Sequence, residues 1–187
     1  MRLILLGPPG AGKGTQAEKL KTSLNVPHLS TGDMFRAAIK AKTHLGLAVK
    51  AIVDRGDLVS NEMVWGIVSE GLSGPDCANG FILDGFPRSL EQAEMLGSML
   101  QEKGEGLDHV VQLTANEEEL VERLLQRAKE LGRKDDTEEV IRHRLKVYTE
   151  ETAPLAAYYK EKGLLREIDG MGTIEQVASD VQTVLKG

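Results

Sequence analysis

The first twenty residues contain the feature that most constrains the fold of this chain. An apolar run, "RLILL" (residues 2–6), passes directly into a glycine-rich turn, "GPPGAGKG" (residues 7–14), and the turn leads into a helical pattern. A short apolar run bounded by turn residues is typical of a buried strand. A buried strand that runs through a short loop into a helix is the repeating unit of α/β proteins, so we expect a parallel sheet covered by helices.

Four further apolar runs repeat this pattern, and helical patterns separate them. The runs lie at residues 26–30, 80–84, 109–113 and 164–168, the first being the weakest. The fold class predicted is therefore α/β, with a five-stranded parallel sheet flanked by helices in three layers. Residues 30–59 are mostly helical without strands, and residues 128–136 are charged and broken by glycine, so we expect two appendages near the carboxyl ends of the strands, where ligands bind in such sheets.

Local signals mark where several helices begin and end. An N-cap residue followed three positions later by Glu or Gln predicts a capping box. Gly163, which follows a helical pattern and precedes the last apolar run, predicts a helix end. The predicted capping boxes pair Asn116 with Glu119, Asp136 with Glu139, and Thr173 with Gln176.

Size and charge exclude several classes of protein. A chain of 187 residues can form one compact domain and bury about 70% of its unfolded surface. The net charge of −6 argues against a nucleic-acid or membrane surface, and no window approaches the roughly 20 apolar residues of a membrane span. The one cysteine, Cys77, excludes an internal disulfide and is expected to be a loop thiol. Without a signal-peptide pattern, we expect a cytoplasmic protein.

The glycine turn carries the pattern of a phosphate loop, G-x-x-x-x-G-K, from Gly7 to Lys13. Backbone N–H groups of such a loop cradle phosphate oxygens, the helix dipole adds to them, and Lys13 supplies charge for the β- and γ-phosphates. The next residue is Gly14, and the hydroxyl group that usually ligates magnesium arrives one place later, at Thr15. Magnesium would then depend on phosphates, water and an outer-shell carboxylate, for which Asp84 is the candidate unless it only caps a turn.

Arginines gather near the flexible segments of this acidic chain. Guanidinium groups bind phosphate oxygens in a bidentate geometry that ammonium groups cannot match. Arg123 and Arg127 lie one helical turn apart on the same face, whereas Arg142 is expected to lie on a solvated helix face. The set indicates several bound phosphates, and therefore a second nucleotide; its members are Arg36, Arg88, Arg123, Arg127, Arg133 and Arg144.

Six blocks resemble the signatures of the adenylate kinase family, in the family's order and over nearly the whole chain. They are "GPPGAGKGTQA", "LSTGDMFR", "GDLVSNEM", "FILDGFPRSLEQA", "GRKDD" and "TAPLAAYY". The resemblance implies a P-loop fold and reversible transfer of the γ-phosphoryl group from Mg-ATP to AMP, giving two ADP. It implies a core of residues 1–29, 60–126 and 137–187, an AMP-binding segment of residues 30–59, a short lid of residues 127–136, no structural zinc, and a monomer.

The resemblance also assigns roles to individual residues. Those implied to bind ATP are Gly10, Ala11, Gly12, Lys13, Gly14, Thr15, Arg127 and Gly172. Those implied to bind AMP are Thr31, Arg36, Asp57, Leu58, Val59, Gly85, Phe86, Pro87, Arg88, Gln92, Arg133 and Arg144. The catalytic set implied is Lys13, Asp84, Arg88, Arg123, Arg127, Arg133 and Arg144, with Asp33 and Asp84 as water-mediated partners of magnesium.

Three other functions are compatible with a phosphate loop. A UMP/CMP kinase would share the fold, but the resemblance implies that Thr31 favours AMP, since relatives that prefer pyrimidines tend to have a smaller residue there; Gln92 and the "LVSNEM" segment also favour AMP. A GTP switch protein would need an N-K-x-D motif, which the sequence lacks. A nucleotide-sensing module without turnover would not need so complete a set of arginines.

Overall fold

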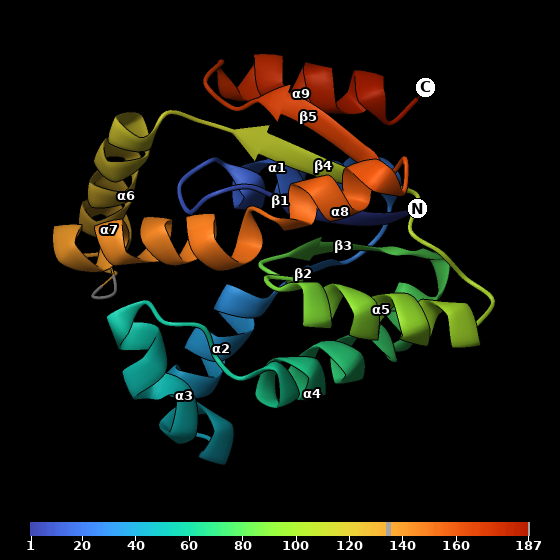
Figure 1. Ribbon diagram of the computed structural model, residues 1–187. Helices are drawn as coiled ribbons and strands as arrows, with labels where there is room; N and C mark the ends of the chain where they lie inside the picture. Colours follow the sequence, from blue (N-terminus) through green and yellow to red (C-terminus); the bar gives the residue numbers. More distant parts are fainter. Residues whose placement is uncertain (134–135, 187) are drawn as a thin grey trace.

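Five parallel strands form one sheet in the part of the chain that the computed structural model describes, residues 1–133 and 136–186 (Figure 1). The strands are β1 (Arg2–Leu6), β2 (His28–Ser30), β3 (Phe81–Asp84), β4 (His109–Thr114) and β5 (Leu165–Asp169). Their order across the sheet is β2-β3-β1-β4-β5. Each strand falls on one of the five predicted apolar runs, so the predicted fold class is confirmed. Because β1 is the central strand, the glycine loop leaves the middle of the sheet.

Helices cover both faces of this sheet, and some of them extend beyond its carboxyl edge (Figure 1). The α-helices are α1 (Lys13–Leu24), α2 (Thr31–Lys40), α3 (His44–Arg55), α4 (Asn61–Leu72), α5 (Leu90–Glu102), α6 (Glu117–Leu131), α7 (Glu138–Val147), α8 (Leu155–Glu161) and α9 (Ile174–Val184). A short 3₁₀-helix, η1 (Pro75–Asn79), precedes β3, and one π-helical turn, η2 (Tyr148–Thr152), follows α7.

The side chains of β1 divide between two apolar cores, as expected for a strand whose residues alternate between the faces of a sheet. Leu3 and Leu5 belong to a core with residues of α1, α6, α7 and α9. Ile4 and Leu6 belong to a second core with residues of α4, α5 and α8. The sheet is thus the middle of three layers, and its carboxyl edge is left for the loops.

Residues 30–59 contain α2 and α3 after β2 ends at Ser30, as the helical pattern predicts. The two helices pack against each other, α2 lies beside α4 and touches β2 and β3, and α3 lies farther from the sheet (Figure 1). Phe35 of α2 and Val49 of α3 are buried in the same core as Val64 of α4. This segment therefore shares an apolar core with α4, and α2 also contacts β2 and β3.

The predicted break between the two helices of the lid region begins too early. The expectation that residues 127–136 separate these helices is wrong, because α6 continues to Leu131 and ends at Gly132, whose φ of 62° is left-handed. Residues 127–131 are good helix formers despite their charge, so the helix continues until the glycine. Lys134 and Asp135 of the predicted lid, and Gly187 of the predicted core, lie outside the described residues.

The predicted helix signals have mixed outcomes. The capping box between Thr173 and Gln176 and the helix end at Gly163 are confirmed. Asn116 does cap α6, but its side chain accepts from the N–H of Glu118, and Glu119 instead pairs with an arginine.

The capping box predicted at Asp136 is wrong. Thr137 caps α7 by accepting from the N–H of Val140, and the carboxylate of Asp136 is buried among arginines. The local spacing rule found the right helix start to within one residue, but it assigned the cap to the wrong side chain.

Cys77 is not the loop thiol that the sequence predicts. It lies in η1, is buried, and its Sγ lies 3.4 Å from the carbonyl oxygen of Gly71. Burial raises the pKa of this thiol, which keeps it protonated. Across residues 1–133 and 136–186, the helices are too short or too polar to cross a membrane.

Candidate active site

The loop after β1 and the N-terminus of α1 form one wall of a cavity of about 390 Å³ at the carboxyl edge of the sheet. Gly12 caps α1 with a φ of 93°, so the backbone turns sharply into the helix. The ammonium group of Lys13 donates to the carbonyl oxygens of Gly7 (2.7 Å) and Pro8 (3.0 Å). Of the residues expected to bind ATP, those that line this cavity are Gly10, Gly12, Lys13, Gly14, Thr15 and Arg127.

Two residues of the expected ATP set lie away from the described lining of this cavity. Ala11 of the loop is buried in the core with residues of α6 and α9. Gly172 lies in the turn between β5 and α9, where an added Cβ would approach the Gln176 side chain to 3.3 Å.

Asp84 lies where the parallel register predicts, at the carboxyl end of β3. It pairs in register with Leu5 of β1 and with Ser30 of β2. An added Cβ at Gly14 would lie 3.8 Å from Asp84 Oδ2, so the loop passes directly beside this carboxylate. The missing hydroxyl at position 14 therefore faces a carboxylate supplied by the neighbouring strand.

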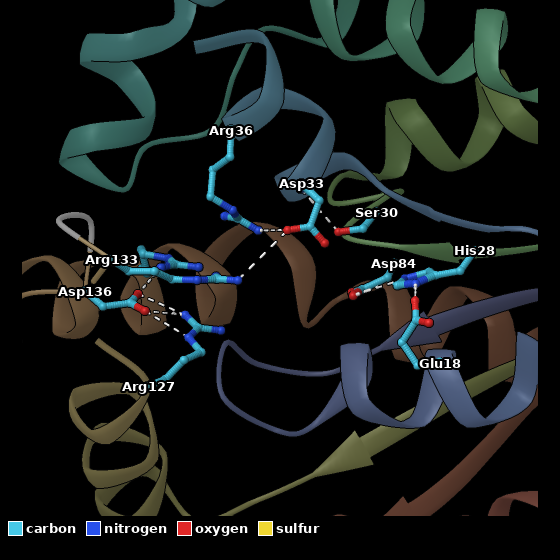
Figure 2. A network of polar contacts seen from close by, with 10 residues as sticks. Glu18, His28, Ser30, Asp33, Arg36, Asp84, Arg127, Arg133 and Asp136 are labelled. Atoms are coloured by element: carbon cyan, nitrogen blue, oxygen red, sulfur yellow. Dashed lines mark hydrogen bonds and ion pairs between the residues drawn. The ribbon is translucent and has the colours of Figure 1, made fainter. Parts of the chain in front are cut away.

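His28, a residue that the sequence does not single out, lies between the carboxylates of Asp84 and Glu18 (Figure 2). The Nε2 atom of His28 lies 3.7 Å from Asp84 Oδ2, and its Nδ1 atom lies 3.0 Å from Glu18 Oε1. Burial lowers the pKa of His28, but the two carboxylates outweigh burial and the pKa is raised. Burial alone would raise the pKa of Asp84, but His28, Lys13 and Arg88 outweigh it and the pKa is lowered. Asp84 is therefore held as a carboxylate.

The surroundings of Lys13 disfavour its charged form, whereas those of Asp84 favour the carboxylate. Burial lowers its pKa from 10.5 to about 8, Asp84 opposes this change, and Arg88, Arg144 and Arg127 add to it. The cavity is thus a region of concentrated positive charge, and the ammonium group of Lys13 lacks a fully compensating anion. An anionic ligand would relieve this repulsion.

Opposite the glycine loop, a buried carboxylate holds two arginines in place (Figure 2). Arg127 binds Asp136 through both Nε (2.9 Å) and a terminal nitrogen (2.6 Å), and Arg144 donates to Asp136 at 2.7 Å. The Asp136 side chain is fully buried, whereas Arg127 and Arg144 remain partly exposed to the cavity. Since a buried carboxylate must be paired, Asp136 fixes both guanidinium groups toward the cavity.

A second acidic residue links the two appendages. Asp33 of α2 accepts from Arg36 at 2.6 Å, and Arg133, just beyond α6, lies 3.9 Å away (Figure 2). Burial favours the protonated form of Asp33, but the arginines and Ser30 outweigh burial and its pKa is lowered. Arg123 of α6 donates to the carbonyl oxygen of Gly170 (3.1 Å) and pairs with Glu119. All six arginines of the predicted set line the larger cavity.

A smaller cavity of about 60 Å³ adjoins the larger one on the side of α2 and α4. Arg88 donates through Nε to the carbonyl oxygen of Gly85 (2.8 Å), and the Thr31 hydroxyl donates to the same oxygen (2.8 Å). Gly85 has a φ of 80°, and a Cβ there would lie 2.6 Å from Thr31 Oγ1, so only glycine fits. The residues of the expected AMP set that line this cavity are Thr31, Arg36, Asp57, Leu58, Val59, Gly85, Arg88, Gln92 and Arg144.

The remaining residues of the expected AMP set lie elsewhere. Phe86 is buried in the apolar core with its ring 6.1 Å from that of Trp65. Pro87 and Arg133 line the larger cavity.

Several residues of the site carry no signal of their own in the sequence. Asn61 accepts from Gln92 Nε2 (2.8 Å), and Gln92 Oε1 accepts from the N–H of Arg88 (2.8 Å), so both ends of the Gln92 amide are bound. Thr152 of η2 donates to the carbonyl oxygen of Arg88 (2.9 Å), and Tyr148 of the same turn lines the larger cavity. Asn61 and Thr152 do fall within the quoted blocks "GDLVSNEM" and "TAPLAAYY", but nothing local distinguishes them as contacts of Arg88 or Gln92.

These features define a P-loop protein with room for more than one phosphate group. They are the parallel sheet, the glycine loop that ends at Lys13, and the two adjoining cavities lined by arginines. The family model described as adenylate kinase matches residues 5–164. Adenylate kinase of Chelativorans sp. (strain BNC1) is 51% identical over 191 residues, which cover 99% of this chain and 98% of that protein. An adenylate kinase of Methylorubrum extorquens is 53% identical over 193 residues, covering 100% of this chain and 96% of that protein.

A third relative, adenylate kinase of Thermobifida fusca (strain YX), is 51% identical over 186 residues, covering 100% of this chain and 98% of that protein. The chain belongs to the adenylate kinase family. It is accordingly a phosphotransferase of the nucleoside monophosphate kinases, as the six sequence blocks predict.

Proposed function

We propose that this chain catalyses the reversible transfer of the γ-phosphoryl group of Mg-ATP to AMP, giving two ADP. The observation that carries this proposal is the wall that the two cavities share. Arg36, Arg88 and Arg144 line both cavities, so a phosphate in either one meets the same guanidinium groups. Phosphoryl transfer requires the donor and acceptor phosphates to meet in line, with positive charge around the transferring group.

ATP is assigned to the larger cavity. The backbone of residues 10–15 would wrap its phosphates, and Lys13 would contact the β- and γ-phosphates. Arg127, which Asp136 holds in place, would lie along the same phosphates. The implied contact of the ATP base near Gly172 stays a prediction, since Gly172 lies in the turn after β5.

AMP is assigned to the smaller cavity and the shared wall. Arg36 and Arg88 would bind its phosphate, and Thr31, Gln92 and the backbone of residues 57–59 would contact the adenine. Gln92 is held by Asn61 and by the N–H of Arg88, which supports its use as a fixed group at the edge of a base. Phe86 would act by packing below this loop, since its ring is buried.

The residues act by position and charge rather than as bases. The acceptor is already an anion, so no side chain has to remove a proton. Lys13, Arg88, Arg123, Arg127, Arg133 and Arg144 would neutralise charge on the transferring group. Residues 30–59 and 127–136 would close as AMP-binding segment and lid over the core, excluding water that would hydrolyse ATP. The contact of Arg133 with Asp33 joins these two segments and supports such closure.

Magnesium is the cofactor that we assign, bound together with ATP. In the described part of the chain, no cluster of three or more His, Cys, Asp or Glu could hold a metal ion by itself. Asp84 fits an outer-shell role, because it is a carboxylate beside Gly14 at the mouth of the loop. The ion would neutralise the phosphates, and Asp84, with Asp33 farther away, would orient its water ligands. We further propose a cytoplasmic monomer that binds neither nucleic acid nor membrane.

The test measures ADP formation from Mg-ATP with AMP, UMP, CMP or GMP offered separately. We expect AMP to be the best acceptor and ATP to be stable when no acceptor is present. Faster transfer to UMP or CMP would assign the chain to pyrimidine nucleotides, and binding of ATP and AMP without ADP formation would indicate a sensing module.

A further inference from the structure

Helix α7 contacts the AMP-binding segment through a pair of side chains outside the arginine cluster. His143 Nε2 lies 2.7 Å from Asp57 Oδ1, although the two residues are 86 positions apart in the sequence. Arg55 donates through Nε to the other oxygen of Asp57 at 2.9 Å. The Asp57 carboxylate is therefore bound on one side from within its own segment and on the other side from α7.

The backbone beside this pair is packed directly against α7. Gly56 ends α3 with a φ of 81°, and a Cβ added there would lie 2.5 Å from Arg144 Cγ and 3.1 Å from Val140 Cγ1. A hydrogen-bonded pair and a close backbone contact thus coincide where α3 ends. The loop that begins there, residues 57–59, lines the smaller cavity.

We propose that His143 is a positioning residue for AMP, acting through Asp57 on the base-binding backbone of residues 57–59. The inference rests on the proposed function and deepens it. His143 is adjacent in sequence to Arg144, which lines both cavities. The pair therefore ties the backbone that contacts the adenine to the helix that carries a phosphate-binding arginine. AMP then binds to a loop that is already ordered, which lowers the entropy cost of binding.

The pair predicts an effect on one substrate only. The glycine loop that would bind ATP lies on the opposite side of the larger cavity, and neither His143 nor Asp57 is among its described contacts. The side chains are 43% and 37% exposed, so the expected effect is that of a surface polar pair, about two- to five-fold in affinity. Loss of His143 leaves Asp57 bound to Arg55 and partly solvated, so the variant is expected to fold.

The experiment is a double-mutant cycle with His143→Ala, Asp57→Asn and the double variant. It measures the Kd of AMP by calorimetry, together with kcat and the KM values of AMP and ATP. We expect each single change to raise the Kd and KM of AMP about two- to five-fold, with little change in kcat or in the KM of ATP. The double variant should bind AMP no more weakly than the single variant with the lower affinity. The coupling free energy between the two changes should become smaller in 0.5 M salt. His143→Lys, which supplies an N–H donor from the same position, should restore AMP affinity.

Arg142→Ala is the matched control, because it breaks an exposed pair with Glu138 inside the same helix. We expect it to leave AMP affinity unchanged. Unaltered AMP affinity in His143→Ala, strictly additive effects of the two single changes, or an equal rise in the KM values of both substrates would overturn the proposal. Failure of the proposed function would instead appear in the wild-type protein, as an absence of ADP formation from ATP and AMP.

Discussion

The two walls of the larger cavity are built in different ways. The glycine-loop wall comes from one continuous stretch, residues 7–15, whose backbone geometry follows from its own glycines and from the start of α1. The arginine wall comes from α2, the loop after β3, α6 and α7, and a buried carboxylate orders part of it. Local sequence therefore specifies the first wall, whereas tertiary packing specifies the second, and the two should respond differently to substitution.

The largest effect is expected at the shared part of the arginine wall. Arg88→Ala removes a guanidinium group that lines both cavities, while the glycine loop is untouched. Loss of one such charge at the transferring group typically lowers kcat by about 10²–10³-fold. ATP binding, measured by calorimetry, should persist. Turnover near that of the wild type would remove Arg88 from the mechanism.

Asp136, which holds two arginines of the wall, should contribute more to the stability of the fold than an exposed ion pair does. Asp136→Asn leaves Arg127 and Arg144 without the carboxylate that both bind. Breaking a buried charge pair commonly costs about 3–5 kcal/mol, and the solvent exposure of the arginines places the expected loss of unfolding free energy at or below about 3 kcal/mol. Urea denaturation measures it. Arg142→Ala, at an exposed pair on the same helix, should change it by less than about 0.5 kcal/mol.

These two predictions concern residues that differ in how well the sequence reveals them. The sequence identifies Arg88 because it falls in a block of the family at a set distance from Asp84. It misses the role of Asp136, because the N-cap rule considers only residues a few positions apart, and the partners Arg127 and Arg144 come from two helices. The burial of the Phe86 ring is likewise a matter of tertiary packing, since its neighbours Gly85 and Pro87 line the cavities and nothing local in the block sets Phe86 apart.

The strands were predictable for the opposite reason. Each of the five is a short apolar run between turn residues, and a parallel register brings their carboxyl ends, and so Ser30 and Asp84, to one edge. The end of α6 was less predictable, because the charged residues after Arg127 suggest a break, although they are helix formers and the helix ends only at Gly132. His28 carries no pattern at all, since its contacts with Glu18 and Asp84 arise only when β2, β3 and α1 come together.

The role of Lys13 in the glycine-loop wall can be tested by the protons that it takes up when ATP binds. In the free protein the pKa of Lys13 is lowered to about 8, and phosphate groups beside it favour the ammonium form. ATP binding should therefore take up protons increasingly as the pH rises through 8, and Lys13 should contribute little uptake well below that pH. Calorimetry at pH 8.5 in buffers of different ionisation enthalpy measures this uptake. Lys13→Arg should abolish it, and equal uptake in that variant would contradict the assignment to Lys13.

The smallest effect concerns His28 behind the glycine-loop wall. Because its folded-state pKa is raised, its contribution to stability is present below the unfolded value of about 6.5 and is lost as the pH rises through the folded value. We compare the wild type with His28→Gln by the difference between their unfolding free energies. This difference should be larger at pH 6 than at pH 9, by up to about 1 kcal/mol. Urea denaturation at both pH values measures the difference, and a difference that does not depend on pH would show that the ion pairs are not its source.

The shared arginine wall should hold both reacting phosphates, and one measurement tests this most directly. A single turnover with ATP labelled in the γ-phosphate, in the presence of AMP and excess enzyme, follows the label itself. If the shared wall brings the two phosphates together, the label passes to the β-phosphate of the ADP formed from AMP, and no free phosphate is released. Release of labelled phosphate to water, or failure of the label to reach AMP while both nucleotides are bound, would contradict it.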